Sequence, residues 1–298
     1  MANKRKDRVN LIEKLAVRPK GKVSMDDFDP GYTWKGVKKE NAKQLLSDGV
    51  RRLAALQDKF YAQDTYSLLI VLQAMDAAGK DGTIRHVMSG LNPQGCQVYS
   101  FKGPSPEERD HDYLWRSMKA LPERGRIGIH NRSYYEEVLV TRVHPQILES
   151  QQLPADRKRN AIWKERYEQI NNFEDYLVDN GVLVLKCFLN VSRKEQKRRF
   201  MGRLDRPEKN WKFSVNDVKE RAFWKDYMKA YEDVLSHTST KQAPWYVIPA
   251  DNKWFARLAV GTIIYTTLEG LDLQYPKVGK EKKQELLAAR ALLEAEKD

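Results

Sequence analysis

The chain has 298 residues, of which 41% are hydrophobic and 32% are charged, and its formal net charge is +12. This length and apolar content allow one large α/β core or two smaller ones and exclude a chain that is disordered throughout. The surplus of Lys and Arg favours a polyanionic partner such as a nucleic acid, an anionic lipid surface or a chain of phosphates, although it also agrees with a merely solubilising surface.

The N-terminal residues 1–33 are basic and turn-rich, so we expect an arm, assigned to 1–40, that wraps the core or a neighbouring molecule. They contain no apolar stretch typical of a secretory signal. No apolar run in the chain reaches the roughly 18 to 20 residues of a membrane span. Cys96 and Cys187 lie in apolar or strand-like segments and predict buried thiols in a reducing compartment. We therefore expect a cytoplasmic protein that has no membrane partner.

Five short apolar runs alternate with longer segments of helical periodicity, the first of which covers about 41–62. Strands separated by helices favour right-handed crossovers and a parallel sheet covered on both faces, which is a three-layer α/β/α fold. The expected strands are Leu68–Leu72, Gln97–Phe101, Ile127–Ile129, Val182–Leu189 and Trp245–Ile248.

Two serines mark helix starts between these strands. Ser105 precedes a Pro and two Glu residues, and Ser192 with Glu195 has the spacing of a capping box. After Ser105 we expect one helix that carries Leu114 and Met118 on its core face. The charged segment 276–298, with its Leu/Ala stripe, predicts a surface helix that follows a central domain at 41–275.

The first expected strand runs into a glycine-containing loop and then a helix, over 67–83. Such a loop presents backbone N–H groups and a helix N-terminus to a phosphate, and Lys80 would reach the outer phosphates. Against the strict pattern G-x-x-x-x-G-K-[ST], Ala74 replaces the first Gly and Asp81 replaces the hydroxyl residue. An ordinary strand-to-helix turn therefore stays an alternative. The candidate phosphate-binding residues of the loop are Asp76, Ala77, Ala78, Gly79, Lys80, Asp81, Gly82 and Thr83.

In parallel sheets ligands bind at the carboxyl ends of the strands, which places 76–83, 102–105 and 130–135 on one rim. Kinases use an acidic residue near the end of such a strand for Mg²⁺, and this chain has Asn131 there. An uncharged amide cannot neutralise a metal, so the acidic role would pass to Asp76 or Glu136. Arg132 is suited to bidentate contact with phosphate oxygens.

A basic cluster covers 198–213, at the end of a predicted helix, and suggests a lid at about 198–216. Its cations would neutralise a bound polyanion and exclude water on closure. We expect Trp211 and Phe213 to be buried and to anchor it; a solvated face is the alternative. The candidate anion-binding residues outside the loop are Arg116, Arg198, Arg199, Arg203, Lys209 and Lys212.

Other chemistries have little support. The five His residues and the two Cys residues lack zinc-site spacing, and no hydrolase elbow or dinucleotide fingerprint is present. The basic regions lack the RNA-recognition aromatic motif and zinc-finger spacing, so we expect no nucleic-acid partner.

Five segments in chain order, Val71–Val87, Asp110–Arg116, His130–Val143, Arg206–Phe213 and Ala243–Trp254, resemble the second family of polyphosphate kinases. The resemblance spans about 28–275, and a loop without the leading Gly is a trait of that family. It implies a P-loop kinase fold related to thymidylate kinases, with a helical lid.

The resemblance also implies Mg²⁺-dependent phosphoryl transfer, with Mn²⁺ as an alternative ion, between inorganic polyphosphate and an adenine nucleotide. The family's site motifs fall on Asp76, Gly79, Lys80, Asn131, Arg132 and Glu136, with Asp76 and Glu136 as the metal ligands. Many members have Asp at the position of Asn131, and the Asn is similar to the subgroup that accepts both AMP and ADP. Homo-oligomers, dimers or tetramers, are expected by the same resemblance. The alternatives are an ATP-dependent nucleoside monophosphate kinase and a non-catalytic polyanion binder.

Overall fold

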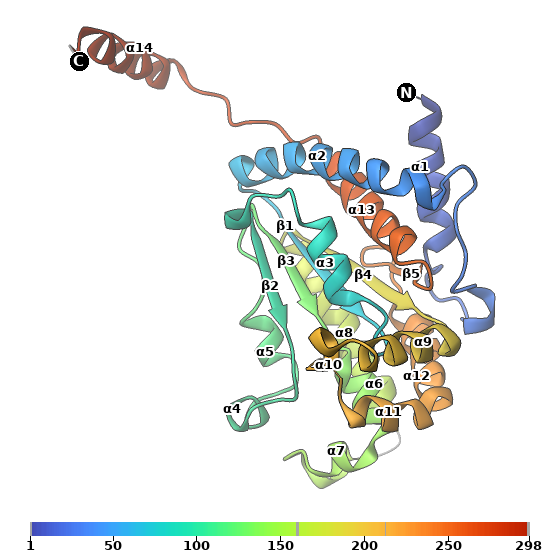
Figure 1. Cartoon of the computed structure of the whole chain (residues 1–298). Helices are drawn as coiled ribbons and strands as arrows, with labels where there is room; N and C mark the ends of the chain where they lie inside the picture. The colour runs from blue at the N-terminus through green and yellow to red at the C-terminus, as the bar shows by residue number, and fades with distance from the viewer. Residues whose placement is uncertain (1, 159–160, 212, 297–298) are drawn as a thin grey trace.

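Five parallel strands form one sheet at the centre of the molecule (Figure 1). The computed structural model describes residues 2–158, 161–211 and 213–296. The strands lie in the order β2-β3-β1-β4-β5, and each neighbouring pair is parallel. The predicted parallel α/β sheet is confirmed. The strands are β1 (Ser67–Gln73), β2 (Cys96–Ser100), β3 (Ile127–Asn131), β4 (Val182–Asn190) and β5 (Trp245–Pro249).

The central strand β1 lies between β3 and β4, and every one of its residues is buried. A strand that is apolar on both faces needs cover on both sides of the sheet. In the register, Leu72 of β1 lies beside Asn131 of β3. The loop after β1 and the loop after β3 therefore start at the same edge.

Helices cover the sheet in two layers, as Figure 1 shows. The predicted helix at 41–62 is confirmed as α2, which buries Val50, Leu53 and Phe60. One layer consists of α2 (Lys39–Gln63), α3 (Lys80–Val87) and α13 (Lys253–Glu269), with α1 (Ala2–Leu15) packed on α13. The other layer consists of α6 (Glu136–Val143), α8 (Ile162–Asp179) and α12 (Trp224–Thr238).

Other helices lie at the edges of these layers. These α-helices are α4 (Pro106–Arg109), α5 (Trp115–Met118), α7 (Pro145–Glu149), α9 (Arg193–Leu204), α10 (Pro207–Asn210) and α11 (Val215–Glu220). The 3₁₀ helices are Met25–Asp27, Pro93–Gly95, Ala155–Arg157 and Arg221–Phe223. No helix within the described ranges has both the length and the apolar content to cross a membrane.

Two local predictions were wrong. The single helix expected after Ser105 is divided into α4 and α5, because Asp112 Oδ1 accepts a hydrogen bond from the Leu114 N–H at 2.8 Å and forms a turn. As a result Met118 is 48% exposed and not in the core. At α9 the Ser192 hydroxyl caps the Glu195 N–H, but the reciprocal half of the capping box is absent. The Ser192 N–H donates instead to Asp251 Oδ1 at 2.7 Å.

The N-terminal segment lies on this chain's own core. Its first part is α1 and not the expected turn-rich arm, because Leu11 and Leu15 pack into the core. The Val17 N–H then donates to the Trp245 carbonyl at 2.8 Å, and Ala16 forms an antiparallel bridge with Tyr246 of β5. This segment covers the edge of the sheet.

The C-terminal helix α14 (Lys280–Ala295) stands away from the rest of the molecule, and its residues are exposed (Figure 1). The predicted surface helix is thereby confirmed, whereas the division into an arm, a central domain and a tail stays a prediction. Both cysteines are free thiols; Cys187 is buried as expected, but Cys96 is only half-buried.

Candidate active site

The loop between β1 and α3 has the geometry of an anion cradle. Ala77 (φ 60°) and Gly79 (φ 111°) both lie in the left-handed region, which turns the chain sharply before α3 begins at Lys80. The N–H groups of Gly79, Lys80 and Asp81 have no hydrogen-bond partner in the described part of the chain. Thr83 is buried, and its N–H donates to the Gly79 carbonyl at 2.9 Å. Free N–H groups at a helix start are the donors that bind phosphate.

The carbonyl groups of the loop point toward α9. Arg199 Nη1 donates to the carbonyls of Ala77 and Ala78 at 3.0 and 2.6 Å, and Gln196 Nε2 donates to that of Asp76 at 2.9 Å. Three consecutive carbonyls are thereby held on one side of the loop, which leaves its N–H groups for a ligand.

Lys80 lies among three acidic groups and one basic group. Its Nζ donates to the Ala74 carbonyl at 3.1 Å. Burial lowers the pKa of Lys80, as does the charge of Arg132, while Asp76, Glu136 and Asp81 oppose the shift. The ammonium therefore interacts both with acidic side chains of the loop and with Arg132 and Glu136, which follow β3.

Arg132 follows β3 in a left-handed conformation (φ 64°), which is uncommon for a residue with a side chain. Its Nη2 donates to Asp76 Oδ1 at 3.1 Å. Asn131 Nδ2 donates to Asp81 Oδ1 at 3.0 Å, and Asn131 Oδ1 is buried without a partner among the described residues. The structure thus brings the ends of β1 and β3 together, as the sequence predicted.

Glu136 is the first residue of α6, and its carboxylate interacts electrostatically with Arg132 and Lys80. Gln73, in the amide orientation that satisfies both of its neighbours, donates to Glu136 Oε1 at 2.9 Å and accepts from Ser133 Oγ at 3.0 Å. Burial raises the pKa of Glu136, whereas Arg132 and Lys80 oppose the shift.

The basic cluster after the fourth strand forms the helices α9, α10 and α11. Arg198 is mostly exposed and ion-pairs with Glu195, while Lys209 is half-buried on α10. Arg199 differs from the expectation for a mobile lid: its side chain is only 4% exposed and is bound to the phosphate loop. Lys212 lies outside the described residues.

The expected burial of both aromatic residues in this cluster is met only in part. Phe213 is half-buried and packs edge-on against Phe200, with 6.3 Å between the ring centroids. Trp211, in contrast, is 78% exposed, so the prediction that it is buried was wrong. Its indole N–H donates to the Glu208 carbonyl within the same turn, which holds the ring on the surface.

Comparison with known proteins identifies the family. The family model "Polyphosphate kinase 2 (PPK2)" matches residues 36–276, which is most of the chain. The chain belongs to the polyphosphate kinase 2 family. A crystal structure of polyphosphate kinase 2 from Arthrobacter aurescens TC1 superimposes with a TM-score of 0.86 at 41% identity, covering 96% of this chain and 97% of that one. The P-loop kinase-like fold is therefore confirmed.

Two curated relatives of this family carry specific names. The ADP-polyphosphate phosphotransferase of Rhodopseudomonas palustris is 52% identical over 266 residues, which are 89% of this chain and 91% of the relative. The AMP/ADP-polyphosphate phosphotransferase of Meiothermus ruber is 45% identical over 268 residues, which are 89% and 96% of the two chains.

In this polyphosphate kinase 2 chain the sequence reading also missed an acidic residue just beyond the predicted lid. Asp217 of α11 lies 3.6 Å from Arg203 of α9, measured from carboxylate oxygen to guanidinium nitrogen. Burial raises the pKa of Asp217, the charge of Asp76 raises it further, and Arg203 opposes the shift. Asp217 thus comes close to the phosphate loop from a segment about 140 residues away, and no local motif marks it.

A second missed feature is a row of cations from α3 and α13. Arg85, Lys253 and Arg257 form no ion pair with any described side chain, and Arg257 Nη2 lies 3.6 Å from where a Cβ on Gly82 would stand. Burial lowers the pKa of Lys253 to about 8, and the nearby Arg199 and Arg257 contribute. The start of a helix directly after the β5 strand end was the signal that could have indicated this row.

Arg116 lies at the end of β2, in a cavity of about 440 Å³. Its Nη1 donates to the Lys102 carbonyl at 2.8 Å, it ion-pairs with Glu108, and its guanidinium lies 5.2 Å from the Phe101 ring centre. These contacts fix the guanidinium within its own segment, and its role as a phosphate clamp stays a prediction.

The acidic residues fit a divalent ion only partly. Over 2–158, 161–211 and 213–296, no three His, Cys, Asp or Glu side chains are arranged as a metal site. Mg²⁺ commonly binds to one or two carboxylates and completes its shell with water and substrate phosphates. Asp76, whose side chain is 28% exposed, suits such a site. Glu136 suits it less, because Gln73 already bonds its carboxylate.

Proposed function

We propose that this polyphosphate kinase 2 transfers the terminal phosphoryl group of inorganic polyphosphate to AMP or ADP. The observation that carries the choice of donor is the row of Arg85, Lys253 and Arg257 beside the phosphate loop. An ATP donor continues from its phosphates into an adenosine, whereas polyphosphate continues as a chain of charges. Cations that form no ion pair among the described residues suit the second donor. The names of the relatives support the same reaction.

In this proposal the transferring end of the donor lies on the free N–H groups of the loop and on Lys80. Arg132 holds the phosphate of the acceptor, with its guanidinium oriented by Asp76. An acceptor phosphate is already an anionic nucleophile, so the site needs position and charge neutralisation more than a strong base. Arg203 and Asp217 form an ion pair between α9 and α11, which would hold these two helices together in the predicted lid.

A divalent cation, Mg²⁺ or Mn²⁺, would be held by Asp76 and by the phosphates, and Glu136 stays a predicted second ligand. When bound, the ion would neutralise charge on the oxygens between donor and acceptor. This chain's own residues do the remaining work: Arg199 holds the loop, and Glu136 keeps Arg132 and Lys80 in place by charge. Homo-oligomeric assembly stays a prediction.

The test supplies either polyphosphate or ATP as the phosphoryl donor, never both together. Purified protein with MgCl₂ is incubated with polyphosphate and AMP, with polyphosphate and ADP, or with ATP and AMP, and nucleotides are separated by chromatography. We expect ADP and ATP to form in the first two mixtures. Product in the ATP mixture alone would instead support an ATP-dependent monophosphate kinase, and no product in any mixture would support a non-catalytic polyanion binder.

A further inference from the structure

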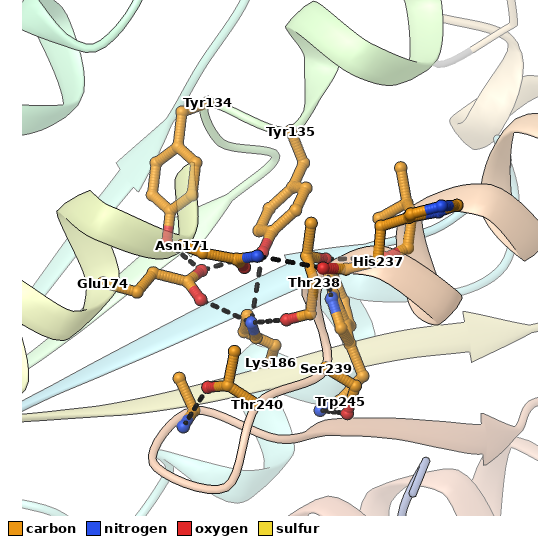
Figure 2. A network of polar contacts seen from close by, with 12 residues as sticks. Tyr134, Tyr135, Asn171, Glu174, Lys186, His237, Thr238, Ser239, Thr240 and Trp245 are labelled. Carbon is orange, nitrogen blue, oxygen red and sulfur yellow. Dashed lines mark hydrogen bonds and ion pairs between the residues drawn. The ribbon is translucent and has the colours of Figure 1, made fainter. Parts of the chain in front are cut away.

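A buried ion pair contacts the hydroxyls of Tyr134 and Tyr135, which follow Arg132 in the chain (Figure 2). Lys186 comes from the middle of β4 and Glu174 from α8, and both side chains are 0% exposed. Lys186 Nζ lies 2.5 Å from Glu174 Oε2. This pair does not contact the phosphate loop, and the proposed reaction makes no direct use of it.

Every polar group of the pair is satisfied, as the dashed lines in Figure 2 show. Besides Glu174, the Lys186 ammonium donates to Tyr135 Oη at 3.1 Å and to the Thr238 carbonyl at 2.6 Å. Glu174 Oε1 accepts from the hydroxyls of Tyr134 and Tyr135, each at 2.8 Å. The three ammonium donors thus have three acceptors, and both tyrosines are fixed at their far ends.

Stability alone is a weak explanation for such a pair. Burial raises the pKa of Glu174 and lowers that of Lys186, and each partner opposes the shift of the other. Removing charges from water costs free energy that their attraction regains only with good geometry, so apolar residues of similar volume often stabilise a fold equally well. A positional role gives the pair a consequence that apolar packing does not provide.

The two tyrosines connect the pair to the site through the backbone. They are the only residues besides Ser133 between Arg132, with its left-handed φ of 64°, and Glu136, which faces Lys80. A left-handed conformation at a non-glycine residue persists only when its surroundings determine it. Fixed phenol rings two and three residues later, on Tyr134 and Tyr135, supply such a constraint.

We propose that the Lys186–Glu174 pair, acting through Tyr134 and Tyr135, is a positioning element that holds Arg132 and Glu136 in their reactive arrangement. This inference rests on the proposed function. The donor side of the site, the phosphate loop with the cation row, is built on other elements. Loss of the pair should therefore disturb the acceptor side and the rate of transfer while donor binding persists.

The test compares three Tyr→Phe variants of the full chain, of which Tyr134→Phe and Tyr135→Phe each remove one hydroxyl from the network. Tyr167→Phe is the matched control: Tyr167 lies on α8, as Glu174 does, and the variant loses a hydrogen bond from Arg142 of α6 at 2.6 Å, but Tyr167 does not touch the 132–136 segment. A double variant, Glu174→Met with Lys186→Met, removes both charges of the pair, so that no buried charge is left without its partner.

We expect Tyr135→Phe and the double variant to lower kcat at least about tenfold, as for a misplaced catalytic group, and to raise the KM for AMP or ADP. The KM for polyphosphate should be unchanged, and Tyr167→Phe should match the parent. Parental kcat in folded Tyr134→Phe and Tyr135→Phe variants would overturn the inference, as would an equal loss in Tyr167→Phe. A parent without any transfer would instead overturn the proposed function, and this inference with it.

Discussion

Replacing Arg199 by Met tests whether this arginine supports the phosphate loop or binds the donor. Its guanidinium donates to four backbone carbonyls, those of Ala77 and Ala78 in the loop and those of Ala250 and Asp251 after β5. The side chain is only 4% exposed, and Met fills a similar volume without donors. The substitution therefore removes the connection between two segments while it keeps most of the packing.

The magnitude follows from these four carbonyls. A buried acceptor that loses its partner costs about 1 kcal/mol or more, so the sum is about 4 kcal/mol. At about 2–4 °C for each kcal/mol in a chain of this size, Tm should fall by about 10 °C. The loop would also lose its fixed direction, so we expect kcat to fall by roughly a hundredfold.

The assay combines calorimetry with steady-state kinetics at a temperature well below both transitions. Arg198→Met is the control, because this neighbour is 73% exposed and its ion pair with Glu195 contributes about 1 kcal/mol or less. We expect the control to keep the parental Tm and kcat. If Arg199→Met keeps its Tm and kcat and only raises the KM for polyphosphate, the guanidinium binds the donor and the loop-support account is wrong.

Three further substitutions examine the rest of the site. Lys80→Ala should lower kcat/KM by roughly a hundred- to a thousandfold with an unchanged circular dichroism spectrum, because the ammonium group that binds the transferring phosphate is lost. Full activity would mean that the loop does not bind this phosphate. Asn131→Asp places a second carboxylate against Asp81, where the amide now donates at 3.0 Å, at a cost of about 1–4 kcal/mol. We expect the ratio of kcat/KM for AMP and ADP to change, because the substitution adds a charge beside the incoming phosphate, and an unchanged ratio would place acceptor choice elsewhere. Finally, kcat/KM for polyphosphate should fall as the pH rises through about 8, where Lys253 loses its charge; if Lys253→Gln shows the same fall, another group titrates.

The fold was predictable because its signals are local. A strand buried on both faces, such as β1, must be a continuous apolar run, and α2 must repeat its apolar residues with helical spacing. The parallel arrangement then determines which loops share an edge, so the meeting of Lys80 with Asn131 and Arg132 could be expected.

The remainder depends on contacts between distant segments. A run of arginines does not indicate that Arg199 turns inward to loop carbonyls while Arg198 stays in water. Likewise Glu195 bonds both arginines and not the N-terminus of its helix, which is why the capping box predicted from spacing forms only by half. Asp217 interacts electrostatically with Asp76 although about 140 residues separate them in the sequence. Each of these outcomes is decided by tertiary packing.

The most direct test of the central claim follows the phosphoryl group itself. Polyphosphate labelled with ³²P is incubated with the protein, MgCl₂ and unlabelled ADP in the absence of ATP, and products are separated by chromatography. We expect the label in the γ-phosphate of ATP, at a rate that depends on Lys80. Label released only as inorganic phosphate, or labelled ATP formed equally well by Lys80→Ala, would contradict direct transfer from polyphosphate at this loop.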